Sequence, residues 1–257
     1  MPPPPSAADA AHIARQFGGA DGYERHAQVQ AAVAGELARR VGPGAARVLE
    51  IGCGTGLLTR ALVHAGVRGD WLVTDLAPEM VARCRAAMAE VAGPEVRFAV
   101  LDANGAMPVG PWDLIVSSLA FQWLADLPGA LAAMAARLAP GGALCFATLV
   151  AGTFAEWQAA HAAEGVRAGG IAYPEIDALS AMAPAGGTWA IEVRDHVAVY
   201  PDARAFLHAV KGIGAGAARA DHVPLSAATM RRVMRAFDRA GAPATYRVAY
   251  CRWRLSA

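Results

Sequence analysis

A short apolar run that ends in an acid, followed at once by three alternating glycines, constrains this chain more than any other feature. Residues 48–56 read Val-Leu-Glu-Ile-Gly-Cys-Gly-Thr-Gly, and a helical pattern of apolar residues begins at Leu57. The apolar run predicts a buried strand, and the glycines predict a tight turn into the start of a helix. Glycine tolerates positive φ and lets a ligand approach the backbone, while a helix start offers free N–H groups. The segment therefore predicts a ligand-binding loop between a strand and a helix.

The spacing of the glycines separates two classes of cofactor loop. A dinucleotide loop reads G-x-G-x-x-G, but here the third glycine comes one residue early, at Gly56, and Leu57 follows it. The order acid-x-G-x-G-x-G instead resembles the loop of Rossmann-like S-adenosylmethionine-dependent methyltransferases. That resemblance implies that Glu50 lies near the ammonium of the cofactor, and it disfavours a nicotinamide dehydrogenase. A glycine-rich turn that binds nothing stays open as the alternative, because glycine motifs alone are weak signals.

Polar residues end three further predicted strands. Apolar runs predict strands over residues 71–75, 96–102, 112–118 and 143–150. The first three end at Asp75, Asp102 and Ser118, and because ligands of open α/β sheets bind at the carboxyl ends of strands, we expect these side chains beside the glycine loop. Asp75 follows the loop at about the separation at which an acid binds ribose hydroxyls. Single acids after strands are commonly turn formers or helix caps, so their shared position with the loop is what favours a cofactor site.

The order of predicted elements indicates the fold class. Helical patterns occupy residues 9–41, 57–65, 78–92, 154–164, 175–182, 203–210 and 226–240, and a further helix starts at Asp126. Residues 189–200 and 245–254 predict a last antiparallel pair of strands. We therefore expect an α/β fold: a Rossmann-like seven-stranded, mostly parallel sheet with a terminal antiparallel hairpin, N-terminal helices and a helical cap insertion. The expected organisation is a disordered Pro-rich lead at 1–10 and one domain at 11–257, with the cofactor half at 45–150 and cap and substrate elements within 11–42 and 154–240.

Composition excludes several classes of partner. The net charge of +1 provides no overall field that would draw the protein to nucleic acid. No uninterrupted apolar run reaches the roughly 18 residues that span a bilayer, and the N-terminus has no signal-peptide pattern. The four cysteines are scattered, with no C-x-x-C pair, which predicts reduced thiols and neither a metal site nor a disulfide framework. We therefore expect a cytoplasmic protein with no metal, no nucleic-acid partner and no membrane partner.

Several stretches form a further pattern in chain order: Phe17, Tyr23–Ala27 with Gln30, Ser118–Trp123, Pro140–Gly142 with Ala147–Thr153, Val210–Ala215 and Thr245–Tyr246. Together they resemble the malonyl-acyl-carrier-protein O-methyltransferases, which begin the pimeloyl half of biotin synthesis. The Gln-Trp pair at 122–123 and the Lys-Gly-Ile-Gly-Ala segment at 211–215 distinguish this family from the wider class. The chain departs from the family where Ser118 replaces the common asparagine and where Leu101, not glycine, precedes Asp102.

The resemblance implies a substrate and a mechanism. The expected reaction transfers a methyl group from S-adenosylmethionine to the free carboxylate of a malonyl thioester on acyl carrier protein or coenzyme A. That carboxylic acid, with a pKa of about 4, is already ionised at pH 7, so no general base is expected. The implied cofactor contacts are Tyr23, Gln30, Glu50, Gly52, Cys53, Gly54, Gly56, Asp75, Leu76, Asp102, Ala103 and Ser118. The implied substrate-positioning residues are Tyr23 and Lys211, with Ser118, Gln122 and Trp123 as further substrate contacts.

The last predicted helix carries a basic cluster formed by Arg231, Arg232, Arg235 and Arg239. Such a cluster is usually a solvated face, but acyl carrier protein is acidic, so the resemblance makes it a candidate docking patch.

Lys211 is the only lysine of the chain. Two interpretations of it stay open: a surface lysine beside a turn, and a cation that binds the substrate. Two other functions stay open: a methyltransferase acting on a quinone carbon or another carboxylate, and a cofactor-binding protein without catalysis.

Overall fold

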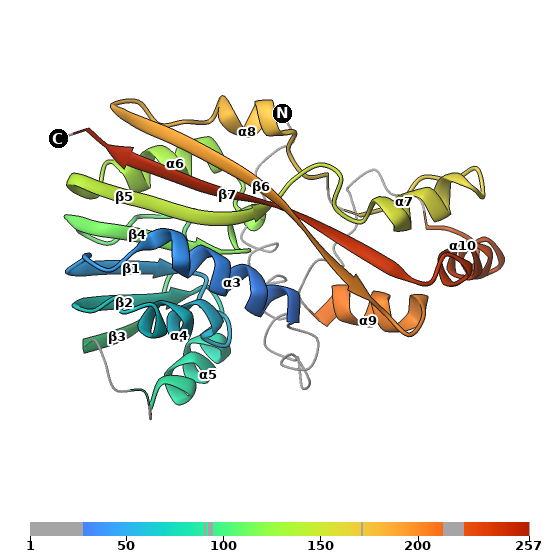
Figure 1. Cartoon of the computed structure of the whole chain (residues 1–257), viewed down its shortest axis with the longest axis horizontal. Coiled ribbons are helices and arrows are strands. Elements are labelled where there is room, and N and C mark those ends of the chain that lie inside the picture. Colours follow the sequence, from blue (N-terminus) through green and yellow to red (C-terminus); the bar gives the residue numbers. More distant parts are fainter. Residues whose placement is uncertain (1–27, 90, 92–94, 171, 213–223, 257) are drawn as a thin grey trace.

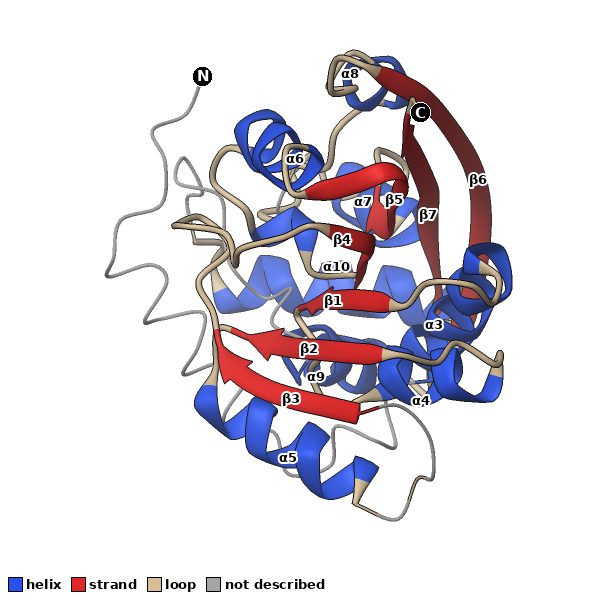
Figure 2. Cartoon of the chain, turned by 90° about the vertical axis from the view of Figure 1, so that its left-hand side faces the viewer, coloured by secondary structure: helices blue, strands red, loops and turns tan. Residues whose placement is uncertain are grey.

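A seven-stranded sheet with helices on both faces forms the molecule (Figures 1 and 2). The structure, a computed structural model, describes residues 28–89, 91, 95–170, 172–212 and 224–256, without the side chains of 211 and 212. The strands are β1 Arg47–Ile51, β2 Asp70–Asp75, β3 Glu95–Val100, β4 Trp112–Ser118, β5 Leu138–Leu149, β6 Gly187–Val199 and β7 Pro243–Leu255. The helices are α3 Gln28–Val41, α4 Leu57–His64, α5 Pro78–Met88, the 3₁₀ turn η1 Phe121–Trp123, α6 Leu127–Ala135, α7 Ala155–Ala162, α8 Ile176–Ser180, α9 Ala203–Gly212 and α10 Ala227–Arg239.

The strand order is β3-β2-β1-β4-β5-β7-β6. Strands β1 to β5 pair in parallel, whereas β7 runs antiparallel to both of its neighbours, β5 and β6. The predicted fold class, a Rossmann-like and mostly parallel sheet that ends in an antiparallel pair, is therefore confirmed. Helices α9 and α10 lie between β6 and β7 in the chain, so the last two strands are neighbours in the sheet without forming a tight hairpin.

Alternate residues of the central strands bury themselves on opposite faces of the sheet, as the two-residue period of a strand requires. Val48 of β1 and Val116 of β4 join one apolar cluster with α3 and α4, while Leu49 and Ile115 join a second cluster with α6 and α8. Both faces of these strands are covered, which explains why their sequences read as continuous apolar runs.

Three helices gather at one end of the sheet, beyond the carboxyl ends of the parallel strands. Helices α7, α9 and α10 lie there beside the extended ends of β6 and β7 (Figure 1). An aromatic cluster holds them together, with Phe206 of α9 packing 5.1 Å from Phe237 of α10 and 5.3 Å from Trp157 of α7 between ring centroids. These helices stand where the sequence predicted a helical cap.

Several predicted element ends differ from the structure. Helix α5 stops at Met88, four residues before its predicted end, and β3 stops at Val100, two residues before Asp102. The Pro-Gly-Gly segment at 140–142, which precedes the predicted strand at 143–150, lies inside β5, which begins at Leu138. The register between β4 and β5 shifts there, between Trp112 and Leu114, so the segment is accommodated as an irregularity in the ladder.

Within the described ranges, no helix is long and apolar enough to cross a membrane, and no group of three or more metal-ligating side chains could hold a metal ion.

Candidate functional site

The point at which the strand order reverses lies between β1 and β4, since β2 and β3 extend to one side and β5, β7 and β6 to the other. Ligands of open α/β sheets bind in the crevice at the carboxyl ends of the strands at such a point. The loop after β1 and the loop after β4 approach each other closely there: a Cβ added to Gly52 would lie 2.4 Å from Cβ of Ala120. The topology thus places the predicted glycine loop at the position that a ligand site requires.

The glycine loop has the conformation that its sequence predicts. Gly52, Gly54 and Gly56 have φ values of 73°, 52° and 84°, in the left-handed region that favours glycine. The amide of Gly56 donates to the carbonyl of Cys53 over 2.9 Å, and Gly56 is the N-cap of α4. The buried Cys53 donates its own amide to the carbonyl of Thr74 at the end of β2, over 2.9 Å, which ties the loop to the neighbouring strand.

Glu50 is a buried acid without a hydrogen-bond partner. Glu50 is the penultimate residue of β1 and is 1% exposed. Neither of its carboxyl oxygens forms a hydrogen bond with any group in the described part of the chain. Burial raises its pKa well above the ordinary value, and the neighbouring Cys84 and Asp75 add to the rise. Thr59 is close enough to oppose that rise, and its hydroxyl also lies 3.4 Å from Sγ of Cys84, where either atom can be the donor. A buried carboxyl with two free oxygens is costly unless a donor or cation meets it.

Asp75, at the end of β2, is held by backbone amides on both sides. Its Oδ2 accepts from the amide of Gly54 over 2.8 Å, and its Oδ1 accepts from the amide of Ala77 over 2.9 Å. Burial raises its pKa, while these backbone bonds and one from half-buried Leu76 oppose the rise. The acid is therefore fixed beside the glycine loop, and each oxygen keeps acceptor capacity for a further donor.

Asp102 and Ala103 lie in the loop that follows β3. Asp102 is exposed, and its Oδ1 accepts from both the backbone amide and the side-chain amide of Asn104, each over 2.9 Å. Asn104 in turn accepts from the amide of Ala125, over 2.9 Å, so the loop is fastened to the segment that follows η1. Asn104 is a link that the sequence did not reveal, because its partner lies more than twenty residues away in the chain.

The turn after β4 contains a strained residue that Gln122 holds in place. Leu119 follows Ser118 and has a φ of 53°, which is uncommon for a residue other than glycine. Its carbonyl accepts from Nε2 of Gln122 over 2.7 Å, and its amide donates to the carbonyl of Ala147 over 2.8 Å. Gln122 Oε1 also accepts weakly from the hydroxyl of Thr148, at 3.5 Å. Much of the amide of Gln122, a predicted substrate contact, is thus used to shape the turn that faces Gly52.

The remaining predicted residues have different positions. Ser118 ends β4 and is half-buried, and Trp123 is half-buried against the apolar cluster. Gln30 lies in α3, is 8% exposed, and its Oε1 has no partner within the described residues. Tyr23 lies outside the described residues, and so does the side chain of Lys211, although the backbone of Lys211 belongs to α9. Their predicted roles stay predictions.

Comparison with known proteins places this site in a class. A methyltransferase domain family matches residues 48–142, which includes the glycine loop, Asp75 and the turn after β4. The chain resembles the YcgJ protein of Bacillus subtilis in structure, with a TM-score of 0.61, 16% identity and coverage of 87% of this chain and 98% of that one. It also resembles the N-methyltransferase NodS of Bradyrhizobium japonicum, solved with S-adenosyl-L-homocysteine, with a TM-score of 0.52, 17% identity and coverage of 96% and 98%. These likenesses show a methyltransferase fold.

Relatives of known name decide the family. A malonyl-[acyl-carrier protein] O-methyltransferase of Magnetococcus marinus is 40% identical over 93% of this chain and 90% of its own length. This chain belongs to the malonyl-[acyl-carrier protein] O-methyltransferase family. The biotin biosynthesis bifunctional protein BioCD of Bordetella avium is 43% identical over 94% of this chain, but the chain spans only 52% of that longer protein. The family resemblance predicted from the sequence is confirmed.

Membership of this family explains the arrangement of residues at the carboxyl ends of the strands. The strand ends of β1, β2 and β4 converge on a buried acid with no partner, a fixed second acid and a loop with three glycines at positive φ. A methyltransferase needs such an edge to hold a cofactor close to a second substrate.

Proposed function

We propose that this chain transfers the methyl group of S-adenosylmethionine to the free carboxylate of a malonyl thioester carried by acyl carrier protein, and so forms the methyl ester that starts pimeloyl synthesis for biotin. The observation that carries this proposal is 40% identity along nearly the whole chain to a malonyl-[acyl-carrier protein] O-methyltransferase. Its four cysteines are free and buried, which suits work in the reducing cytoplasm.

The residues at the strand ends fit the cofactor. Glu50 offers two buried oxygens with no partner, and an ammonium has three donors and no acceptor. The unpaired Oε1 of Gln30 is a second buried acceptor on the face of the sheet that carries α3 and α4. Asp75 keeps acceptor capacity for the hydroxyls of a ribose, and Gly52, Gly54 and Gly56 leave the backbone of the loop open to close approach.

The proposed reaction needs no general base from the protein. When bound, S-adenosylmethionine supplies a sulfonium methyl group that is already electrophilic, and the malonyl carboxylate is already ionised at neutral pH. The residues of the chain therefore act by holding the two reactants in line and by excluding water. The carboxylate needs a cation or hydroxyl donors, for which we propose Lys211 and Tyr23, with Ser118, Gln122 and Trp123 at the edge of the same space.

The decisive experiment is mass spectrometry of malonyl-acyl carrier protein incubated with the protein and S-adenosylmethionine. We expect a mass increase of one methylene, and we expect alkaline hydrolysis of the ester to reverse it. Parallel reactions with malonyl-coenzyme A and with quinone precursors separate the proposed activity from the other two functions. Methylation of a quinone alone, or cofactor binding with no transfer to any of these substrates, contradicts the proposal.

Asp75→Ala tests the cofactor edge. We expect the variant to bind S-adenosylmethionine more weakly by about 1.5–3 kcal/mol, the scale of a lost hydrogen bond to a charged group, as measured by calorimetry. The matched control is Asp113→Ala, because Oδ2 of Asp113 likewise accepts from two backbone amides, Ala46 and Arg47, at the opposite ends of the strands. Both variants lose stability, but the control keeps its affinity; equal affinities in the two variants contradict the role of Asp75.

We propose that α10 docks the acidic carrier protein. Arg231, Arg235 and Arg239 recur every four residues and are all exposed, while Val233 and Phe237 on the other side of the helix are buried. Arg232 forms an ion pair with Glu164 over 2.7 Å, whereas the other three arginines have no acid partner within the described residues. The helix also lies beyond the carboxyl ends of the parallel strands, the same end of the sheet that carries the predicted site (Figure 1).

Charge reversal tests this surface. We expect Arg231→Glu with Arg235→Glu to raise KM for malonyl-acyl carrier protein at least tenfold, because like-charge contacts replace complementary ones. KM for malonyl-coenzyme A and the affinity for S-adenosylmethionine should not change. A charge-matched control is Arg97→Glu with Arg137→Glu, two exposed sites away from α10. An unchanged KM in the α10 variant, or an equal change in the control, contradicts docking on α10.

Lys211→Met tests the substrate cation. The change removes the charge and keeps most of the aliphatic stem. If the ammonium binds the malonyl carboxylate, kcat/KM falls by about one to three powers of ten, the scale of a charge-assisted hydrogen bond, while the affinity for S-adenosylmethionine stays near that of the wild type. Normal turnover, or loss of both affinities together, contradicts this role.

A further inference from the structure

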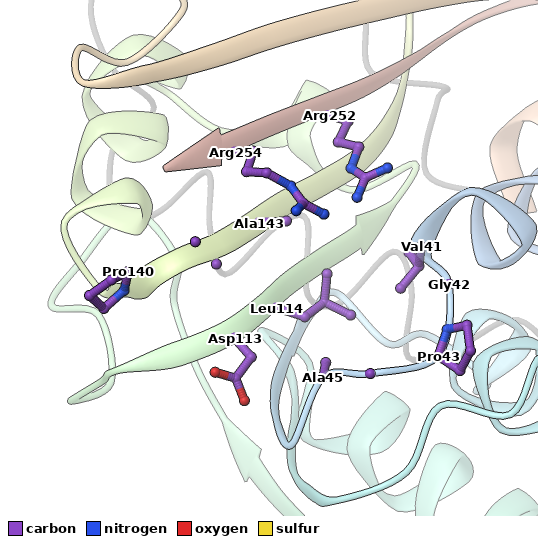
Figure 3. A pocket seen from close by; sticks show the side chains of 13 residues that line it. Val41, Gly42, Pro43, Ala45, Asp113, Leu114, Pro140, Ala143, Arg252 and Arg254 are labelled. Atoms are coloured by element: carbon purple, nitrogen blue, oxygen red, sulfur yellow. The ribbon is translucent and has the colours of Figure 1, made fainter. Parts of the chain in front are cut away.

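A cavity lies at the opposite end of the sheet from the glycine loop. It has a volume of about 330 Å³, within the range of small-ligand sites. The end of α3 with the segment that follows it, and parts of three strands, line the cavity: Val41–Ala45, Asp113 and Leu114 of β4, Pro140–Ala143 of β5, and Arg252 and Arg254 of β7. Figure 3 shows both arginine side chains reaching in from β7 with their guanidinium groups turned toward each other, above Leu114 and Ala143.

The two arginines have no acid partner. Across the ladder, Arg252 faces Cys145 and Ala190, and Arg254 faces Ala143 and Thr188, so no acid stands opposite either one. In the described part of the chain neither guanidinium forms an ion pair or a hydrogen bond. Other arginines of β7 and of its neighbour β6 are paired: Arg247 of β7 with Asp195 over 3.5 Å and Arg194 of β6 with Glu192 over 2.6 Å.

The one acid in the cavity wall does not neutralise them. Oδ2 of Asp113 accepts from the backbone amides of Ala46 and Arg47, over 2.9 and 2.8 Å, and its carboxylate points away from both guanidinium groups (Figure 3). The positive field reaches the buried thiol of Cys145, where both arginines oppose the rise of its pKa to about 11 that burial causes. Two like charges that converge in one cavity without an anion are mutually repulsive, and a bound anion would relieve that repulsion.

The wall of the cavity leaves room for a ligand. A Cβ added to Gly42, Gly44 or Gly141 would meet no atom within 4 Å, so open space lies in front of the backbone both after α3 and in β5. Leu114 and Ala143 form an apolar floor. A guanidinium presents two parallel N–H donors that match the oxygens of a phosphate or a carboxylate.

We propose that this cavity is a binding site for a small oxyanion, the phosphate or carboxylate group of a small ligand held between Arg252 and Arg254. The site is separate from that of methyl transfer: Asp113 at the cavity and Ser118 at the cofactor edge are five residues apart on β4, roughly 17 Å of strand. The proposal therefore stands or falls independently of the proposed function.

The test uses inorganic phosphate and citrate as probes, titrated into the full chain at constant ionic strength with sodium chloride as the balance. We expect saturable binding by calorimetry, a rise in melting temperature with probe concentration, and amide chemical-shift changes centred on Gly44, Gly141 and Ala143. A response to phosphate alone identifies a phosphate ligand, a response to citrate alone identifies a carboxylate ligand, and a response to both supports a general oxyanion site.

Arg252→Gln with Arg254→Gln should weaken the binding of the responsive probe at least tenfold, because both charge-assisted bonds are lost. The charge-matched control is Arg194→Gln with Arg247→Gln, which removes two exposed and paired arginines of β6 and β7. Arg252→Lys with Arg254→Lys keeps both charges without the planar fork and should give an intermediate affinity, so the test does not depend on one variant folding. No saturable binding of either probe, or equal weakening in the control, overturns the proposal.

Discussion

Glu50→Gln should raise the melting temperature of the protein without cofactor and at the same time weaken its binding of S-adenosylmethionine roughly a hundredfold. The amide keeps the size of the carboxyl group but removes an ionisable group whose charged form has no partner among the described residues. Removing one member of a buried ion pair costs about 3 kcal/mol or more, which sets the expected loss of affinity. For a chain of this size, each 1 kcal/mol gained in stability raises the melting temperature by about 2–4 °C.

The pH dependence of this effect has a definite sign. Because burial raises the pKa of Glu50 well above the ordinary value of 4.5, the stability that the group contributes is complete below about pH 4.5 and is lost as the pH rises toward the folded-state pKa. The difference in stability between Glu50→Gln and wild type should therefore grow from pH 5 to pH 8. Asp75 also has a raised pKa, and its charge is one cause of the raised pKa of Glu50, so the difference includes the repulsion between the two acids.

Cofactor binding should show the same linkage. If Glu50 is protonated before the ammonium of the cofactor reaches it, binding releases a proton from wild type but not from Glu50→Gln, and calorimetry in buffers of different ionisation enthalpy measures that difference. A variant whose melting temperature is unchanged or lower at pH 8, with affinity for S-adenosylmethionine intact, contradicts the assignment of Glu50 as the unpaired acid of the cofactor edge.

The parts of the site that the sequence predicted have local signals. Three glycines between an apolar run and a helical pattern indicate a turn with positive φ, and acids at the ends of apolar runs mark the strand ends, so Glu50 and Asp75 could be placed at the same edge. The family resemblance added the substrate, which no local pattern encodes. The seven-stranded, mostly parallel sheet with a terminal antiparallel pair followed from the order of the predicted elements, and the structure confirms it.

The parts that the sequence could not predict depend on contacts between distant segments. No local pattern marks Leu119 as a residue with positive φ, because its conformation depends on its hydrogen bonds with the side chain of Gln122 and with the backbone of Ala147 on the next strand. The bond from the Gly54 amide to Asp75 joins residues on different strands, so an acid predicted only as a ligand contact also shapes the loop. The arginine cavity is assembled from segments more than two hundred residues apart, and no single stretch of sequence shows it.

Gly52→Ala should reduce the affinity for S-adenosylmethionine more than a hundredfold and lower the melting temperature. The added Cβ would lie 2.4 Å from Cβ of Ala120, and the φ of 73° adds the strain that a side chain meets in the left-handed region, about 1–2 kcal/mol. The loops after β1 and β4 must then move apart at the point where the strand order reverses. Gly66→Ala is the control for strain alone, since Gly66 has a φ of 85° and its added Cβ would meet no atom within 4 Å.

A second substitution should separate the steric clash from the strain. Adding Ala120→Gly to Gly52→Ala removes the obstructing Cβ and leaves the Cα of residue 120, 3.9 Å away, as the nearest atom, an ordinary van der Waals contact. The double variant should therefore recover affinity to within about tenfold of wild type, with a favourable coupling of at least about 1 kcal/mol between the two positions. The loss of stability that remains in the double variant should match the stability loss of Gly66→Ala. If Gly52→Ala is as mild as Gly66→Ala, or if Ala120→Gly restores nothing, the close approach of the two loops does not control cofactor binding.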